Sequence, residues 1–474
     1  MTSTHGHITI DNDRPHNRLH DRLKALGAAV TGEVLTPAHP GFDEARHIFS
    51  RHLDRMPAVI VRPRDADDVA EAIAMARESD LEIAVRSGGH SGAGHGTVDG
   101  GLVLDLRDLD SIDIDVASRT AWVGGGATAV AVTKAVGAHG LAIGFGDTGS
   151  VGVGGITLGG GHGFLSRVHG LTIDNVLAVE LVTADGRVVV ADDENHPELF
   201  WALRGGGGNF GVATRFQYQL RELPVVYGGM LMLPATTDTL TRVMELSLAA
   251  PDELTLLASV MPAPPMPFVP EEHHGSMIIM LLVTYAGPAA QGEPVLAPFR
   301  AVATPLADMV REMPYAEMFQ PQPEGYHPIA LSRNGFARGF DRSTAQHIIE
   351  TLVARSESPD VQMAAVQLRL CGGAIARVDA LDTAYAHRQW PLMFNVATVV
   401  SSVDALAAQE PWVEALAATV SDGTPGAYVA FVGDEGPDRI HDIYPSETAG
   451  RLARVKCTWD PDNVFHRNQN VLPA

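Results

Sequence analysis

Glycine is concentrated in three segments of the first half of the chain. The 474 residues include 48 glycines, and nine of these lie within residues 146–163. Two further dense runs lie at 88–101 and 204–211. Such runs disfavour helices and central strands, because glycine loses much conformational freedom on folding and has no side chain to pack. They suit places where backbone N–H groups approach a charged or flat ligand. We therefore expect one extended ligand, about as long as a dinucleotide, to be held by all three segments.

The first segment contains RSGGHS (86–91) and directly follows a predicted strand. Converging N–H groups there suit a pyrophosphate, and Arg86 and Ser87 would add side-chain donors. For this segment alone, an ordinary tight turn is the alternative. The second segment, 146–163, does not open a helix in a clear strand–helix unit, and no acidic residue follows at the spacing of a Rossmann dinucleotide site. We expect it to form neither a helix nor a central strand.

Charge and missing motifs exclude several other classes of function. Acidic residues outnumber basic ones by 57 to 34, and a net charge of −23 repels nucleic acids and anionic membranes. None of the three lysines follows a glycine, so the chain has no GxxxxGK[ST] phosphate-binding loop. HExxH and GxSxG are absent, and His16 and His20 stand in a polar terminus without a third ligand, so we expect no metal site.

Two cysteines cannot build a disulfide framework, and no apolar run approaches the roughly 18 residues that cross a bilayer. The polar N-terminus does not look like a secretion signal. We expect a cytoplasmic protein that binds neither nucleic acid nor membrane. Nothing in the sequence indicates the oligomeric state.

The hydrophobic pattern predicts an α+β fold. A strand at 57–63, a helix at 65–79 and a strand at 81–85 open the first part, which also contains a hairpin at 177–190. After residue 223, longer apolar strands (277–284, 361–370, 392–400) alternate with helices (344–355, 403–420), and a last helix is expected at 446–458. We expect a ligand-binding domain at 1–223, a second domain with an antiparallel sheet flanked by helices at 224–430, and a return to the first domain at 431–474.

Six ordered motifs resemble one known family. They are PAVIVRPRDADDVAEAI, RSGGHS, GGLVLDLRDL, VGVGGITLGGGHGFLSRVHGLTIDNV, ELFWALRGGGGNFGVAT and DPDNVFHRNQN. The chain resembles FAD-linked oxidases of the vanillyl-alcohol oxidase superfamily, on the berberine bridge enzyme-like branch, and among these its bacterial members. The resemblance implies a two-subdomain FAD-binding domain built from both chain ends, and a substrate domain that covers the flavin.

The resemblance also implies how FAD is attached. The histidine of RSGGH, here His90, carries the 8α carbon of the flavin. Many members have a second, cysteinyl tether at the position of Thr148, which cannot form a thioether, so a single covalent link is expected. Val151 matches the small residue that accompanies O2 as electron acceptor. The implied cofactor-binding residues are Arg86, Ser87, Gly88, Gly89, His90, Ser91, Thr148, Ser150, Val151, Gly154, Gly155, Thr157, Gly159, Gly160, Val212, Asn468 and Asn470.

Three residues are candidates for catalysis. His162 stands where plant relatives have an active-site tyrosine, and a histidine with an ordinary pKa near 6.5 can act as a base at neutral pH. It could equally orient the substrate, and a hydrogen-bonded loop histidine is the alternative. Tyr428 matches the tyrosine of a YxN[YF] strand motif, in which Ala430 replaces the asparagine and Phe431 keeps the second aromatic ring. Asn395 is the third candidate, although a one-residue change of register would turn it away from the flavin.

These residues predict an oxidase that transfers hydride from an alcohol or amine carbon of a small substrate, such as a secondary metabolite, to FAD, with O2 reduced to H2O2. A flavin dehydrogenase with another acceptor is one alternative. A flavin- or ligand-binding protein without turnover is the other.

Overall fold

The computed structural model describes residues 15–320 and 325–474. A small sheet begins the fold, with parallel strands β2, β4 and β3 and an antiparallel edge strand β1. Asp65 caps α3 by accepting a hydrogen bond from the Asp68 N–H, and the apolar face of α3 packs on this sheet. The elements are α1 (Pro15–Ala29), β1 (Glu33–Leu35), α2 (Phe42–Arg46), β2 (Val59–Arg62), α3 (Ala66–Glu78), β3 (Ile83–Arg86) and β4 (Leu102–Asp105).

A second, antiparallel sheet has the strand order β5-β6-β10-β8-β9. The expected hairpin is confirmed, because β8 and β9 pair antiparallel across Ala184–Arg187. The elements are β5 (Ile112–Asp115), β6 (Thr120–Gly124), α4 (Ala129–Gly137), β7 (Leu141–Ala142), α5 (Val153–Gly159), α6 (Ser166–His169), β8 (Val176–Val182), β9 (Val188–Ala191), α7 (Pro197–Leu203), β10 (Val212–Gln219) and β11 (Arg221–Glu222). Short β7 and β11 pair with each other.

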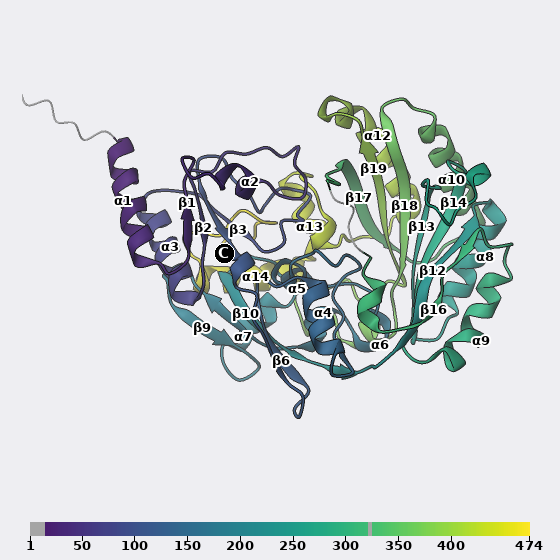
Figure 1. The fold of residues 1–474 in the computed structure, drawn as a ribbon, viewed down its shortest axis with the longest axis horizontal. Helices are drawn as coiled ribbons and strands as arrows, with labels where there is room; N and C mark the ends of the chain where they lie inside the picture. Colours follow the sequence, from purple (N-terminus) through teal and green to yellow (C-terminus); the bar gives the residue numbers. More distant parts are fainter. Residues whose placement is uncertain (1–14, 321–324) are drawn as a thin grey trace, which may run out of the picture.

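The third sheet is large and antiparallel, with the order β15-β12-β14-β13-β18-β19-β17 and β16 beside β12. Its strands are β12 (Val226–Pro234), β13 (Leu254–Pro262), β14 (Met277–Tyr285), β15 (Ala307–Asp308), β16 (Arg311–Met313), β17 (Ile329–Ala337), β18 (Val361–Leu370) and β19 (Leu392–Val400). Helices α8 (Thr237–Leu248), α9 (Ala289–Arg300), α10 (Arg342–Ser356) and α12 (Leu406–Ser421) pack on one face. In Figure 1, α8, α9 and α10 lie on the side away from the small sheet. The α+β class and the helix-flanked antiparallel sheet are confirmed.

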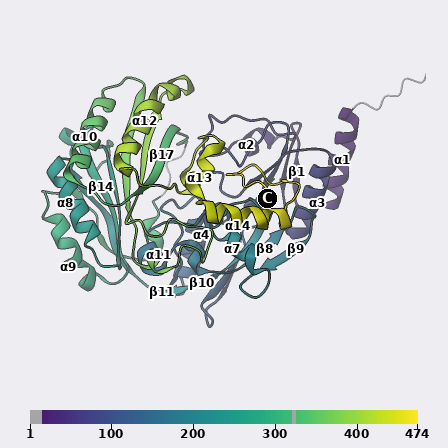
Figure 2. The same cartoon turned by 180° about the vertical axis from the view of Figure 1, so that it is seen from behind.

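The chain returns to its N-terminal half at the end. Helix α14 (Ser446–Trp459) shares a hydrophobic core with α7, through Leu452 and Val455 on one helix and Leu199 and Trp201 on the other. Figure 2 shows α14 lying across the N-terminal half. Phe465 then packs into the core of the small sheet. Both ends of the chain therefore contribute to the same cores. The division at residues 223 and 430 stays a prediction.

Two local expectations are wrong. Residues 153–159 form helix α5 in spite of their glycines. Residues 427–431 form no strand, because Val429–Phe431 is a 3-10 helix. Two further short helices are α11 (Ala374–Arg377), between β18 and β19, and α13 (Ile440–Ile443), between α12 and α14. The Tyr428 N–H donates to the Asn334 side chain at 2.7 Å, which replaces a strand partner. Among residues 15–320 and 325–474, every helix is too short or too polar to cross a membrane.

A buried ion pair joins the C-terminal segment to the third glycine segment. The Lys456 ammonium donates to Asp460 at 2.6 Å, to the Asn209 carbonyl at 2.7 Å and to the Phe465 carbonyl at 2.9 Å. Asp460 also accepts from the backbone N–H groups of Val464 and Phe465. Both charged side chains are fully buried. Burial lowers the pKa of Lys456, and the Asp460 carboxylate acts in the opposite direction.

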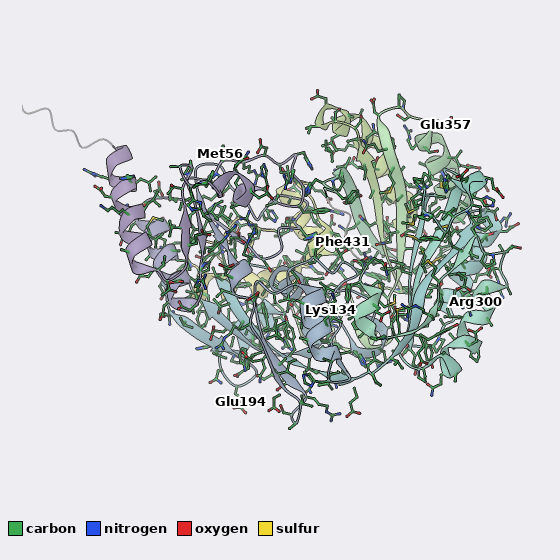
Figure 3. The ribbon with its side chains drawn as sticks, in the orientation of Figure 1. Met56, Lys134, Glu194, Arg300, Glu357 and Phe431 are labelled. Atoms are coloured by element: carbon green, nitrogen blue, oxygen red, sulfur yellow. The ribbon has the colours of Figure 1, made fainter. Side chains whose placement is uncertain are left out.

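We predict that Lys456→Ala lowers the free energy of unfolding by about 3–5 kcal/mol, because Asp460 is left buried without its counter-charge. Urea unfolding followed by the fluorescence of the adjacent Trp459 measures the change. Lys134→Ala, an exposed lysine on α4 (Figure 3), is the control and should change stability by less than about 0.5 kcal/mol. Equal unfolding midpoints for the two variants would contradict this role for Lys456.

Candidate functional site

A cavity of about 380 Å³ lies where the four-stranded sheet of β1–β4 and the five-stranded sheet that contains β10 meet the C-terminal segment. It is lined by β3, by all three glycine segments, by residues 428–432 and by residues 465–469. Segments far apart in the sequence thus surround one space, as expected for one extended ligand. A concave site of this size, built from several loops, is typical of ligand binding.

Most of the residues singled out from the sequence line this cavity. They are Arg86, Ser87, Gly88, Gly89, His90, Ser91, Thr148, Val151, Gly154, Gly155, Gly159, His162, Tyr428 and Asn468. The others lie outside the lining: Ser150, Thr157, Gly160, Val212, Asn395 and Asn470. Ser150 contacts the lining from outside, because its Oγ lies 3.1 Å from the Nε2 of His90, which lines the cavity. The Thr157 hydroxyl is instead 2.7 Å from the Tyr218 hydroxyl, in the core.

The register of β19 settles which way Asn395 points. Leu392, Phe394 and Val396 pack against the helices of the large sheet, whereas Met393 packs against Tyr428. Because side chains alternate along a strand, Asn395 shares the face of Met393 and points toward the N-terminal half. It is paired with Asn334 and Gln367 on the neighbouring strands. Its Oδ1 is buried and has no hydrogen-bond partner among the described residues.

Two glycines let the first two segments meet backbone to backbone. A Cβ atom on Gly88 would lie 2.3 Å from the Gly152 nitrogen, and one on Gly152 would lie 2.0 Å from the Ser87 hydroxyl. Both distances are far below van der Waals contact, so a side chain at either position would separate the segments. This contact places His90 beside Ser150 and Val151.

Most of the donors on the side chains of Arg86 and Ser87 bond to the protein, while the Arg86 Nε is buried without a partner among the described residues, and a role of either in cofactor binding stays a prediction. The Arg86 guanidinium is buried and donates to the Ala45 and His47 carbonyls and to the Asp105 carboxylate, at 2.6–3.2 Å. The Ser87 hydroxyl donates to the Gly125 carbonyl at 2.6 Å. Both side chains therefore hold the segment in place, and their hydrogen bonds go to the protein.

The cavity lining includes an arginine and a histidine that the sequence analysis missed, and the arginine, Arg467, is also ion-paired with Glu82 at 3.4 Å. The histidine is His95, and the Arg467 Nε is buried without a hydrogen-bond partner in the described chain. Burial, together with the charges of Arg467 and Arg55, lowers the pKa of His95 to about 4. Arg467 lies inside the HRNQN motif, so its charge beside two asparagines was a usable signal. Nothing in the local sequence indicated that His95 lines the cavity.

A buried polar cluster surrounds His162, another residue of the lining. The His162 Nε2 lies 3.4 Å from the Cys371 sulfur, and Arg369 forms a 2.6 Å ion pair with Asp147, a lining residue. The Arg369 guanidinium also stacks on Phe431, which lies between the two halves of the molecule (Figure 3). Asp147 and Phe431 line the cavity and were not among the candidates.

Burial and the nearby Arg369 lower the pKa of His162 to about 3. Burial raises the pKa of Cys371 to about 12. The pair is therefore a neutral imidazole beside a neutral thiol at physiological pH. The expectation that His162 has an ordinary histidine pKa is wrong, because a charged imidazolium would be desolvated next to a cation.

Tyr428 is buried, and its hydroxyl oxygen accepts a hydrogen bond from the Gly161 N–H at 2.9 Å. Burial raises the pKa of Tyr428, although the backbone N–H groups of Gly161 and His162 favour the phenolate. The phenol stays protonated at neutral pH, and its oxygen already has a donor. Its own O–H proton is therefore available to an acceptor in the cavity.

Comparisons with known proteins agree with this geometry. Residues 57–192 match the family model "FAD binding domain", and residues 427–472 match "Berberine and berberine like". The (R)-6-hydroxynicotine oxidase of Paenarthrobacter nicotinovorans is 31% identical over 463 residues, which is 95% of this chain and 98% of the relative. The chain belongs to the berberine bridge enzyme-like FAD-linked oxidoreductases. An uncharacterised FAD-linked oxidoreductase of Bacillus subtilis is 29% identical over 94% of this chain and 97% of its own length.

Solved structures support the same family fold. The crystal structure of 6-hydroxy-D-nicotine oxidase from Arthrobacter nicotinovorans matches with a TM-score of 0.83 at 29% identity, and covers 94% of this chain and 98% of its own. A glucooligosaccharide oxidase of Acremonium strictum, described with a 6-S-cysteinyl, 8α-N1-histidyl FAD, matches with a TM-score of 0.82. At 22% identity over 96% of this chain and 99% of its own, this second match shows the fold.

The cavity of this FAD-linked oxidoreductase fits a dinucleotide. Arg467 Nε and the Asn468 Oδ1 are buried without partners in the described chain, so a ligand would satisfy them. The glycine N–H groups and Arg467 suit phosphates, which are anionic. Gly155 and Gly208 line the cavity, and a Cβ atom on either would meet no atom within 4 Å. The absent side chains there leave room for a flat ligand.

We predict that Gly155→Leu reduces FAD content about tenfold or more, because the added side chain fills the cavity without striking the backbone. Gly137→Leu is a matched control, since Gly137 is also helical and its Cβ would have no neighbour within 4 Å. Total flavin per protein, read from absorbance after denaturation, measures the effect, and circular dichroism checks the fold. Full flavin loading of Gly155→Leu would exclude this position from the cofactor site.

Proposed function

We propose that this FAD-linked oxidoreductase is an oxidase of small amines that holds FAD by one covalent bond to His90. The observation that carries the proposal is the cavity in which His90, the three glycine segments and the HRNQN tail converge. Bound FAD would accept a hydride from a substrate carbon and pass two electrons to O2, which leaves as H2O2. The name of the 6-hydroxynicotine oxidase relative supports oxidase chemistry on a small molecule.

The positions of the cysteines support a single tether. Thr148 lines the cavity where some relatives have a cysteine, and a hydroxyl cannot form the thioether. Cys371 is buried beside His162, and Cys457 is exposed on α14. Val151 lines the same cavity, and its small side chain supports O2 as the electron acceptor. The remaining cofactor contacts would come from the glycine segments, Asn468 and Arg467.

Tyr428 and His162 would position the substrate. The Tyr428 proton can be donated to an acceptor atom of the substrate away from the reacting carbon, which leaves the lone pair of an amine nitrogen free. Neutral His162 fixes the wall beside Arg369, which donates to its carbonyl at 3.4 Å. Neither group is a base at neutral pH, since the pKa of His162 is about 3 and that of Tyr428 is raised. An alcohol must lose its O–H proton as hydride leaves, whereas a neutral amine can lose hydride without a base. Amines therefore fit these residues better than alcohols.

The test compares the wild type with His90→Ala after growth with ample riboflavin. Acid-denatured wild-type protein should keep yellow fluorescent flavin in its gel band, and the variant should lose it from the band. Secondary and tertiary amines should give H2O2 with the wild type, and the matching alcohols should give little. Dye reduction without peroxide would make the enzyme a dehydrogenase, and flavin released by acid would disprove the tether.

We predict that Tyr428→Phe lowers kcat about ten- to hundredfold with little change in KM, the effect of losing one hydrogen bond that aligns the substrate carbon with the flavin in the transition state. Between about pH 5 and 8 the pH profile of kcat in the wild type should follow only the protonation of the substrate amine, because neither Tyr428 nor His162 titrates there. Tyr385→Phe is the control: this buried tyrosine packs against Tyr428 but does not line the cavity. An equal loss of kcat in both variants would show that Tyr428 acts through its packing and not by positioning the substrate.

A further inference from the structure

Two side chains outside the cavity lining hold the imidazole of His90. The Phe49 ring stacks on it with a centroid distance of 4.6 Å and an interplanar angle of 18°. The Ser150 Oγ lies 3.1 Å from its Nε2. These contacts fix both the plane of the ring and its rotation within that plane. We infer that Ser150 and Phe49 are positioning residues for attachment of FAD, an inference that rests on the tether proposed above.

Ser150 selects which ring nitrogen reacts. Its backbone raises the His90 pKa, as a carbonyl oxygen that accepts a hydrogen bond from the ring does, while burial has the larger and opposite effect. The Ser150 hydroxyl can accept a hydrogen bond from the ring nitrogen 3.1 Å away, and with that nitrogen as the donor the neutral ring carries its hydrogen on the side of Ser150. Because that nitrogen is Nε2, the lone pair lies on Nδ1, which is left to attack. Burial keeps His90 in this neutral, nucleophilic form.

Phe49 is itself held from two sides. Its backbone N–H donates to the Gly89 carbonyl at 3.1 Å, next to His90. Its carbonyl lies 3.1 Å from the Nδ1 of His327, and the Tyr326 ring lies 6.3 Å from its own ring. The stacked ring is thus fixed by the glycine segment and by the segment that precedes β17. Side-chain packing of this kind limits rotation of the imidazole before the bond forms.

The attachment step balances with O2 as the oxidant. A bond forms between His90 Nδ1 and the 8α carbon of FAD, while one C–H bond of that methyl group breaks. The Nε2 proton leaves on the side of Ser150. Two electrons and two protons are released, and O2, which the proposed oxidase reaction already uses, takes them to become H2O2. Ser150 and Phe49 are needed for this step, and neither enters the cavity.

The experiment measures attachment rather than turnover. Wild type, Ser150→Ala, Ser150→Thr, Phe49→Leu and the exposed control Ser118→Ala are purified in parallel. Precipitation with acid separates covalent flavin in the pellet from free flavin in the supernatant, and intact mass gives the attached fraction. A time course of apoprotein with added FAD and O2 gives the attachment rate.

Ser150→Ala should bind FAD but attach it about tenfold more slowly, the factor expected for loss of one hydrogen bond. Ser150→Thr keeps the hydroxyl and should restore the rate, and Phe49→Leu should be slow while still binding FAD. Attachment at the wild-type rate in both Ser150→Ala and Phe49→Leu would overturn the inference and leave the tether intact. A wild type without covalent flavin would overturn both the inference and the tether.

Discussion

The contact between Gly88 and Gly152 is the constraint on which the site depends. Two loops that are 64 positions apart approach until their backbones touch, and any Cβ atom there would lie 2.0–2.3 Å from a neighbouring atom. One carbonyl outside both loops then fixes what the contact brings together, because the Ser87 hydroxyl of one loop and the Gly154 N–H of the other both donate to the carbonyl of Gly125. His90 and Ser150 meet only because this approach is possible. The glycines are therefore required first by the fold of the site, and only then by the ligand that the site holds.

The C-terminal segment completes the same site through a buried ion pair. Lys456 and Asp460 form a fully buried pair, and Lys456 also reaches the carbonyl of Asn209 in the third glycine segment. The Asn209 side chain in turn accepts from the Val471 N–H and donates to the Gln469 carbonyl. A buried ion pair contributes little net stability, but it fixes register when its partners are fully hydrogen bonded. It is this network that sets Arg467 and Asn468 against the cavity.

Much of the framework could be predicted from the sequence, because local signals and tertiary structure agree there. The helix expected at 65–79 forms with Asp65 as its cap, and the Asp185–Gly186 turn joins β8 to β9. The prediction failed where tertiary contacts override propensity. Residues 153–159 are helical although glycine disfavours a helix, because the helix is packed between Gly125 and residues 429–430. Residues 427–431 resemble a strand motif, yet the Tyr428 N–H bonds to the Asn334 side chain. Neither partner is visible from the local sequence.

Site chemistry was harder to predict than site membership. Motif spacing located His162, but its basicity depends on burial and on Arg369, which lies 207 positions later on β18 and bonds to the His162 carbonyl. A histidine whose pKa is about 3 cannot take a proton from a substrate at neutral pH, and Tyr428 beside it keeps its own proton. The residue types alone suggested a catalytic base, whereas in the structure His162 and Tyr428 can contribute hydrogen bonds and the shape of the cavity. Rate enhancement in such a site must come from the alignment of the substrate carbon with the flavin, which makes the rigidity of the walls part of the chemistry.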